Sequence, residues 1–213
     1  MKSFKTIAFL LFCLVSTIAS AQKIDASKKL FTDIEDALKS PELVYQLDLS
    51  NSDLKLANKN WEKFINLEYL NLSNDHLTTL PKSLTSLKKL KILDISSNDF
   101  VVLPAELLKF PNLDELYLND EKKLNLDKSM SVLLNMNNLK TLHLENDNLI
   151  KLPKSFNKFN KLESLYLNNN KFNQLPLQLK GLQHLEFVDV EGNFNKEQIK
   201  SLENINFGFR IHF

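Results

Sequence analysis

LKILDISSN (residues 90–98) and LESLYLNNN (residues 162–170) are two copies of one nine-residue pattern, L-x-x-L-x-L-x-x-N. Looser copies of the pattern begin at Val44, Leu67, Leu113, Leu139 and Leu185. From Val44 onward, the seven starts are separated by 23, 23, 23, 26, 23 and 23 residues. Self-similarity at a nearly fixed period indicates a repeat protein, in which stacked units bury an apolar face that no single unit buries alone.

The rest of each unit repeats as well. A Leu-Pro pair recurs at Pro81, Pro104, Pro153 and Pro176. Apolar residues three apart follow each pair: Leu84 and Leu87, Leu107 and Phe110, Phe156 and Phe159, Leu179 and Leu182, with Trp61 and Phe64 in the first unit. We assign them to the core. Proline lacks an N–H for a strand ladder and suits an extended or turn-like return path, so the pattern excludes a helical repeat.

Side chains alternate between the two faces of a strand, which predicts that Leu93 and Ile95 point inward and Asp94 points outward. These repeats resemble the leucine-rich-repeat family in its 23-residue Leu-Pro form, over residues 44–193. The resemblance implies an α/β fold: a right-handed, curved solenoid with a parallel sheet on its concave face and short helices or extended turns on its convex face.

The last position of the pattern predicts a ladder of buried asparagines, because an amide both donates and accepts hydrogen bonds. Asn98, Asn170 and Asn193 fit, whereas Ser52, Asp75, Glu121 and Asp147 replace asparagine elsewhere. An ionised carboxylate only accepts, so we expect a less regular ladder at the acidic units. A cation at Asp75 or Asp147 is disfavoured because no paired carboxylates with ligand spacing surround them.

The single 26-residue unit holds three additional residues between Asn119 and Asn138. We expect a longer convex helix with Asp127 as its N-cap, followed by Met130, Leu133 and Met136 at helical spacing. A protruding loop at residues 120–123 that contacts a partner is the alternative.

Both ends of a solenoid need caps. We assign residues 22–43 to an N-terminal helical cap, 44–194 to the seven repeats and 195–213 to a C-terminal cap. Thr32 to Glu35 form a capping box that opens a helix through Leu38. Asn195 caps a helix through about Glu203, with Ile199 and Leu202 facing inward. The alternating residues 205–213 then predict a final strand.

Residues 1–21 have the pattern of a secretory signal: Lys2 and Lys5, an apolar run over residues 7–18, and small residues before a cleavage site after Ala21. Cleavage removes Cys13, the one cysteine, so disulfides and thiol chemistry are not expected. It also lowers Lys+Arg from 27 to 25 against 26 acidic residues, a net charge of −1, which offers no attraction to nucleic acid or to an anionic membrane. We expect a secreted or periplasmic monomer with no membrane insertion.

The concave face is where the resemblance places partner binding. The period predicts two outward rows, one through Tyr117, His143 and Tyr166 and one through residues two positions earlier. The candidate partner-binding residues are Tyr69, Asp94, Glu115, Tyr117, His143, Glu145, Tyr166, Asn168, Phe187 and Asp189. Aromatic side chains dominate interface energetics, although the same rings also stabilise a sheet by stacking. The acidic bias favours a basic or polar partner.

Enzyme chemistry is not supported by the sequence. The four histidines, at positions 76, 143, 184 and 212, show no metal-ligand spacing, and glycine is too scarce for a phosphate-binding loop. We therefore expect no catalytic site, no cofactor and no metal. A hydrolase built on Glu115 and Glu145 is the least favoured hypothesis. The main prediction is a protein-binding module, and the alternative is an envelope-associated protein that binds glycan.

Overall fold

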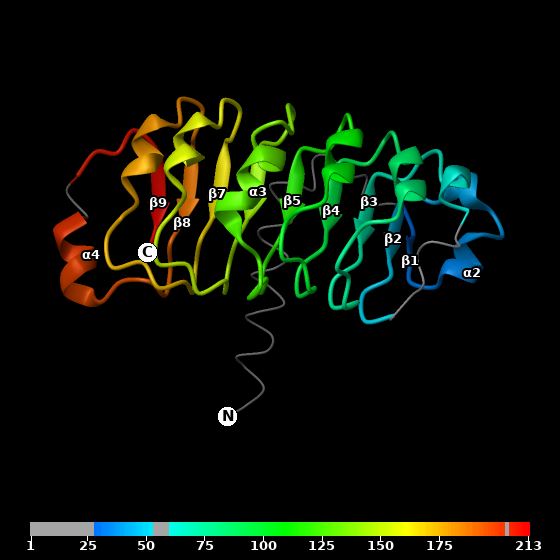
Figure 1. Ribbon diagram of the computed structural model, residues 1–213, viewed down its shortest axis with the longest axis horizontal. Coiled ribbons are helices and arrows are strands. Elements are labelled where there is room, and N and C mark those ends of the chain that lie inside the picture. The colour runs from blue at the N-terminus through cyan, green and yellow to red at the C-terminus, as the bar shows by residue number, and fades with distance from the viewer. Residues whose placement is uncertain (1–27, 53–59, 203–204) are drawn as a thin grey trace.

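The computed structural model describes residues 28–52, 60–202 and 205–213. Nine parallel strands form one sheet in the order of the chain, β1 to β9 (Figure 1). They are β1 (Leu30–Phe31), β2 (Gln46–Asp48), β3 (Tyr69–Asn71), β4 (Ile92–Asp94), β5 (Glu115–Tyr117), β6 (Thr141–His143), β7 (Ser164–Tyr166), β8 (Phe187–Asp189) and β9 (Arg210–His212). The predicted signal segment, including its cleavage site, lies outside the described residues.

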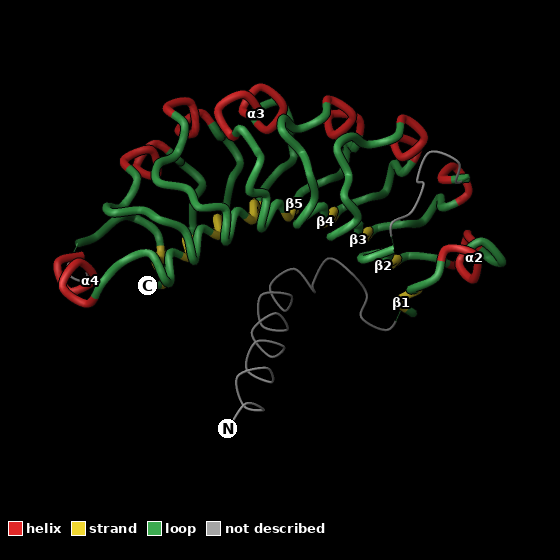
Figure 2. The backbone as a smooth tube through the Cα atoms, turned by 60° about the horizontal axis from the view of Figure 1, so that its bottom comes forward, coloured by secondary structure: helices red, strands yellow, loops and turns green. Residues whose placement is uncertain are grey.

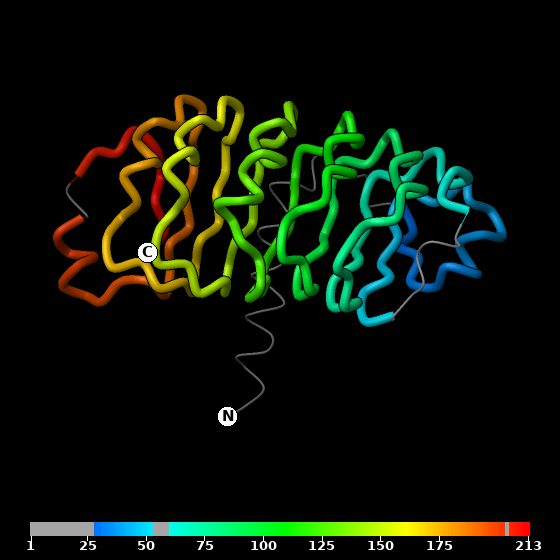
Figure 3. The backbone as a smooth tube through the Cα atoms, viewed as in Figure 1, coloured from blue at the N-terminus to red at the C-terminus, as the bar shows by residue number. Residues whose placement is uncertain are grey.

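Short helical segments connect the strands on the opposite side. The α-helices are α2 (Ile34–Ala37), α3 (Leu126–Leu133) and α4 (Lys196–Leu202). The 3-10 turns are η1 (Pro41–Leu43), η3 (Trp61–Lys63), η4 (Lys82–Ser86), η5 (Ala105–Lys109), η6 (Lys154–Lys158) and η7 (Leu177–Gly181). The units follow one another along the molecule without crossing (Figure 3), and the strands line the inner side of an arch with most of the helical segments on its outer side (Figure 2). This is the α/β solenoid that the repeats predict.

The core is made by the positions that the pattern marks as inward. The central residue of each strand from β2 to β9 is apolar and pairs in register with its neighbour, as in Leu70 with Leu93 and Leu165 with Val188. Convex residues close the same core: the Trp61 and Phe64 rings lie 5.9 Å apart and are 0% and 1% exposed. Each unit thus buries its apolar face against the next unit, which is why the array holds together without disulfides.

A residue with a left-handed backbone lies three positions after the end of each strand from β3 to β8, where the chain turns. The φ angle is between 56° and 62° at Asn74, Ser97, Asp120, Asn146 and Asn169, and 76° at Gly192. Asparagine and glycine tolerate this conformation better than other residues. The asparagine-rich composition therefore has two structural origins, this turn and the ladder position that follows it.

The asparagine ladder is present, and Asn98 shows its geometry. The Asn98 side-chain oxygen accepts from the N–H groups of Asp75 (3.1 Å) and Leu77 (2.9 Å) in the preceding unit. Its amide nitrogen donates to the carbonyls of Leu72 (2.9 Å) and Ile95 (2.8 Å). Each such asparagine satisfies backbone groups of two successive units, so the ladder joins the units through hydrogen bonds as well as apolar packing.

Glu121 and Asp147 make the accepting half of the ladder, so the ladder is less regular at these units, as expected. Glu121 Oε1 accepts from Asn98 N at 2.7 Å, and Asp147 Oδ1 accepts from Glu121 N at 2.7 Å. Glu121 Oε2 and Asp147 Oδ2 are buried without a hydrogen-bond partner. Both residues line a cavity of about 10 Å³, together with the leucines 124, 126, 144 and 149. The ladder is therefore incomplete where these two carboxylates follow one another.

The 26-residue unit contains the longer convex helix, α3, in place of the five-residue 3-10 turns of its neighbours. The prediction that Asp127 caps it was wrong. Asn125 is the N-cap, and its side chain accepts from Lys128 N at 3.0 Å. Asp127 is the second residue of the helix, because Leu126 at the first position packs in the core, where it is 6% exposed.

We predict that Asn125→Ala lowers the free energy of unfolding by about 1 kcal/mol, because it leaves a first-turn N–H without its acceptor. Asp127→Ala is the matched control, since it removes an exposed first-turn acid that does not cap the helix, and we expect a loss below about 0.5 kcal/mol. Urea unfolding monitored by circular dichroism measures both. Equal losses would contradict the assignment of Asn125 as the cap.

The ends differ from expectation in detail. Helix α2 is capped by Asp33, whose side chain accepts from Asp36 N at 2.7 Å, and not by Thr32. At the other end, Asn195 accepts from Gln198 N at 2.9 Å and starts α4, as expected. Ile199 and Leu202 are only half-buried. The predicted strand over residues 205–213 is reduced to Arg210–His212, because the alternation continues beyond the stretch that β8 can pair.

Candidate functional site

Strand register assembles the predicted concave rows. One row runs through Asp48, Asn71, Asp94, Tyr117, His143, Tyr166, Asp189 and His212. The second runs through Gln46, Tyr69, Ile92, Glu115, Thr141, Ser164, Phe187 and Arg210. Adjacent strands in a sheet are about 4.8 Å apart, so the side chains at equivalent positions of two adjacent strands lie next to each other. Eight of the ten candidate residues therefore lie in these two rows, in which residues 117, 143 and 166 are neighbours; the other two, Glu145 and Asn168, follow β6 and β7 by two residues.

Tyr117, His143 and Tyr166 form a continuous ring stack. The Tyr117 and His143 ring centroids are 3.7 Å apart with an interplanar angle of 11°, and those of His143 and Tyr166 are 4.3 Å apart at 4°. Phe187 extends the row, with its ring 5.5 Å from Tyr166. Both faces of the imidazole are covered, so His143 is only 2% exposed although it lies on the concave side.

Two carboxylates hold the edges of the same imidazole. Nε2 of His143 lies 3.2 Å from Glu115 Oε1, and Nδ1 lies 3.2 Å from Glu145 Oε1. Burial alone would lower the pKa of His143, but the charges of Glu145 and Glu115 and their hydrogen bonds raise it to about 9. A cation is therefore enclosed between two rings and two carboxylates at neutral pH.

Glu115 connects this group to the tyrosine beside it. The Tyr117 hydroxyl donates to Glu115 Oε1 at 2.7 Å. Burial and the Glu115 charge raise the pKa of Tyr117 well above its usual range, so the phenol stays a donor. The pKa of Tyr166 is raised to about 12, chiefly by burial and then by Glu115. These groups form a continuous hydrogen-bonded network beneath the concave surface.

The structure thus divides the ten candidate residues into two sets. Glu115, His143 and Asp189 are 2%, 2% and 1% exposed, so they support the face from within. The other seven are half-buried and present part of their surface: Tyr69, Asp94, Tyr117, Glu145, Tyr166, Asn168 and Phe187. The periodicity identifies which residues point outward, but it does not reveal that rings and carboxylates would close over three of them.

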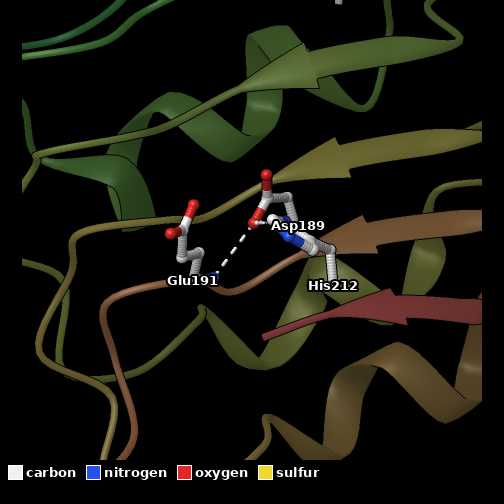
Figure 4. A group of neighbouring side chains, drawn as sticks. All are labelled: Asp189, Glu191 and His212. Atoms are coloured by element: carbon white, nitrogen blue, oxygen red, sulfur yellow. Dashed lines mark hydrogen bonds and ion pairs between the residues drawn. The ribbon is translucent and has the colours of Figure 1, made fainter. Parts of the chain in front are cut away.

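Sequence reasoning missed the C-terminal continuation of the rows. His212 on β9 lies beside Asp189 on β8, with Nδ1 3.2 Å from Asp189 Oδ1, and Glu191 lies next to them (Figure 4). Burial raises the pKa of Asp189, against the hydrogen bonds from Glu191 N and from His212. The signal was available, since His212 follows Asp189 by one 23-residue period.

A shallow hollow of about 370 Å³ lies away from the concave face, between the last two 3-10 turns. Its rim carries Ile150 and Leu177, which are 66% and 72% exposed, beside Lys151 and Lys154. Substitutions in this hollow can serve as controls for substitutions on the concave face. No helix within residues 28–52, 60–202 and 205–213 is both long and apolar enough to cross a lipid bilayer.

An open parallel sheet of registered units, joined by an asparagine ladder, defines a class of solenoid repeat proteins. Comparison with known families agrees. Residues 65–122 match one leucine-rich-repeat profile and residues 161–182 match another. The chain is therefore a leucine-rich-repeat protein. No curated protein matches it in sequence.

Solved structures carry the same fold. A leucine-rich-repeat protein of Leptospira interrogans aligns with a TM-score of 0.58 and 28% identity, over 84% of this chain and 51% of that one. A chain of the Drosophila Toll–Spatzle complex aligns at 0.60 and 18% identity, over 77% and 22%. A chain of the mouse RP105/MD-1 complex aligns at 0.52 and 27% identity, over 64% and 24%. This chain thus spans about half the length of the first structure and about a quarter of the others.

Proposed function

We propose that this chain is a non-enzymatic protein-binding scaffold that works outside the cytoplasm and receives its partner on the concave sheet. The observation that carries the proposal is the registered face itself. Two rows of polar and aromatic side chains cross the sheet from β2 to β9, and the central part is rigidly supported by the His143 network. A preorganised surface loses little side-chain entropy when a partner binds.

The chemistry of this face favours a partner segment rich in lysine or arginine. Asp48, Asp94, Glu145 and Glu191 place carboxylates along it, while the two histidines are already engaged by acidic groups. Tyr69 and Phe187 add aromatic surface, on which cationic side chains also pack. Opposite charge across an interface raises the association rate and selects the partner.

A protein partner is also supported by the comparisons. Two of the similar structures, Toll with Spatzle and RP105 with MD-1, are complexes of proteins by their own descriptions. Glycan binding, the alternative, relies on aromatic faces that are open to a sugar. Here the rings of residues 117, 143 and 166 stack on one another, which leaves little free ring face in the middle of the row. Glycan binding is therefore an outcome of the test below.

We predict that adding two cations to the concave face abolishes binding to the natural partner. In Asn71→Lys with Asn168→Lys, both substitutions lie at half-buried concave positions, one in each half of the sheet. Ile150→Lys with Leu177→Lys is the matched control, because it adds the same charge at the exposed hollow. Native and variant chains are used for affinity capture from envelope and host extracts, with captured proteins quantified by mass spectrometry and glycans by array.

We expect a protein that native chain and control retain equally, and whose capture falls at least about tenfold with the concave variant. The recovered partner is then titrated in increasing salt, where an acidic binding face predicts weaker affinity. Loss of the partner with the control alone would move the site to the hollow. Capture of polysaccharide without protein would replace the proposal with the glycan hypothesis. Circular dichroism excludes unfolding as the cause.

A further inference from the structure

The C-terminal end of the concave sheet brings together three metal-ligand side chains. Asp189 ends β8, Glu191 follows it by two residues, and His212 is its registered neighbour on β9 (Figure 4). One ligand atom from each residue lies within 4.8 Å of the other two. The three side chains converge from two adjacent backbone segments, so no large rearrangement is needed to bring them onto a common point.

The spacing suits a small divalent ion. His212 Nδ1 and Asp189 Oδ1 are 3.2 Å apart. Two ligands bound to one tetrahedral zinc ion at about 2.0–2.1 Å are themselves about 3.3–3.5 Å apart. A shift of a few tenths of an ångström therefore accommodates the ion between them. Glu191 is exposed, and one of its carboxylate oxygens lies within 4.8 Å of the ligand atoms of the other two residues.

Charge distinguishes this group from an ordinary ion pair. The surface pair His76–Asp99 has a similar separation of 3.3 Å, but there Lys123 supplies a second cation 2.7 Å from the same carboxylate. In the set of Asp189, Glu191 and His212, the third member is instead a second carboxylate, and Asp189 is 1% exposed. Arg210, the nearby cation on β9, lies over the Phe187 ring, 5.7 Å from its centroid. Two acids around one imidazole offer the oxygen and nitrogen set that zinc and similar ions prefer.

We propose that Asp189, Glu191 and His212 bind one Zn²⁺ ion, with water or a partner's side chain in the fourth position. The ion links the last repeat to β9, the strand that closes the sheet, and thereby stabilises the C-terminal end of the solenoid. Glu191 also belongs to the acidic concave face of the proposed function, but zinc titration needs no partner, so a failure of this proposal can be told apart from a failure of the proposed function.

The test is isothermal titration of the full chain, produced without a polyhistidine tag, with ZnCl₂ and separately with MgCl₂ as the hard-cation comparison. We expect one zinc per chain, a higher melting temperature with zinc, and no comparable effect of magnesium. Cobalt substitution adds a direct readout, because a tetrahedral Co²⁺ site gives visible absorption bands. We expect His212→Ala to abolish zinc binding and Glu191→Gln to weaken it at least about tenfold.

His76→Ala is the matched control, since it removes the histidine of the surface pair that lacks a second carboxylate, and it should leave zinc binding unchanged. Glu191 is exposed, so Glu191→Gln tests the site even if the His212 variant is poorly folded. The proposal is overturned if the native chain does not bind zinc. It is also overturned if the Glu191 and His212 variants bind zinc as tightly as the His76 variant does.

Discussion

Asn98→Ala is expected to lower the free energy of unfolding by about 3 kcal/mol or more, because it leaves several buried backbone groups without partners. Asn98 is 6% exposed and serves Asp75 N and Leu77 N on one side and the Leu72 and Ile95 carbonyls on the other. When the Asn98 amide is removed, these backbone groups stay away from bulk water, so water does not replace the lost hydrogen bonds. Each buried and unsatisfied donor or acceptor costs about 1–3 kcal/mol.

Urea unfolding of the native and variant chains measures this effect. Asn160→Ala is the control, because Asn160 is an exposed asparagine outside the ladder, and we expect a change within about 0.5 kcal/mol. Asn98→Asp separates the two halves of the ladder, since it keeps the accepting oxygen and loses the donating amide at pH 7. If Asn98→Ala is no more destabilising than Asn160→Ala, the ladder does not hold the units together.

Asp147→Asn is expected to stabilise the protein at alkaline pH, because it restores the donor that the ladder lacks at this unit. Burial raises the pKa of Asp147 to about 8, and the nearby Glu121 charge adds to the shift. In the unfolded chain the same carboxyl ionises near its ordinary value of 3.8. Between these values the folded chain holds a proton that the unfolded chain has released.

Raising the pH through this window therefore favours unfolding. The contribution of the protonated Asp147 to the free energy of unfolding is complete only below about pH 4. It is lost as the pH approaches 8. The native chain should lose on the order of 2–4 kcal/mol between pH 5 and 9 from this group. The amide introduced by Asp147→Asn does not titrate. At pH 9 the free energy of unfolding of the variant should therefore exceed that of the native chain by about that amount, and at pH 5 the two values should differ much less.

Urea midpoints at pH 5, 7 and 9 give the comparison. Glu121→Gln is a second test of the same cavity, since burial raises the pKa of Glu121 to about 7 and it precedes Asp147 along the ladder. Asp127→Asn is the control, because this carboxyl is exposed on α3. A gain from Asp147→Asn that is the same at every pH would contradict proton binding at this position.

Most of the scaffold follows from local spacing. The alternation around Leu93 and Ile95 predicts both the strand and its buried side, since a strand has only two faces. Helix ends were less predictable. Asp127 and Asn125 both suit an N-cap, and the choice between them was made by Leu126, whose burial depends on the packing of α3 against the neighbouring unit.

By itself the sequence determined the period, the open sheet and the list of residues that face its concave side. All three depend on regular spacing along the chain. The tertiary structure alone decided which of those residues are enclosed. His143 is buried because rings from β5 and β7, the Glu115 carboxylate from β5 and the Glu145 carboxylate from the segment after β6 meet around it. His212 likewise becomes a ligand candidate only where β9 pairs with β8. Such contacts depend on distances between units, and these distances are set when the solenoid stacks.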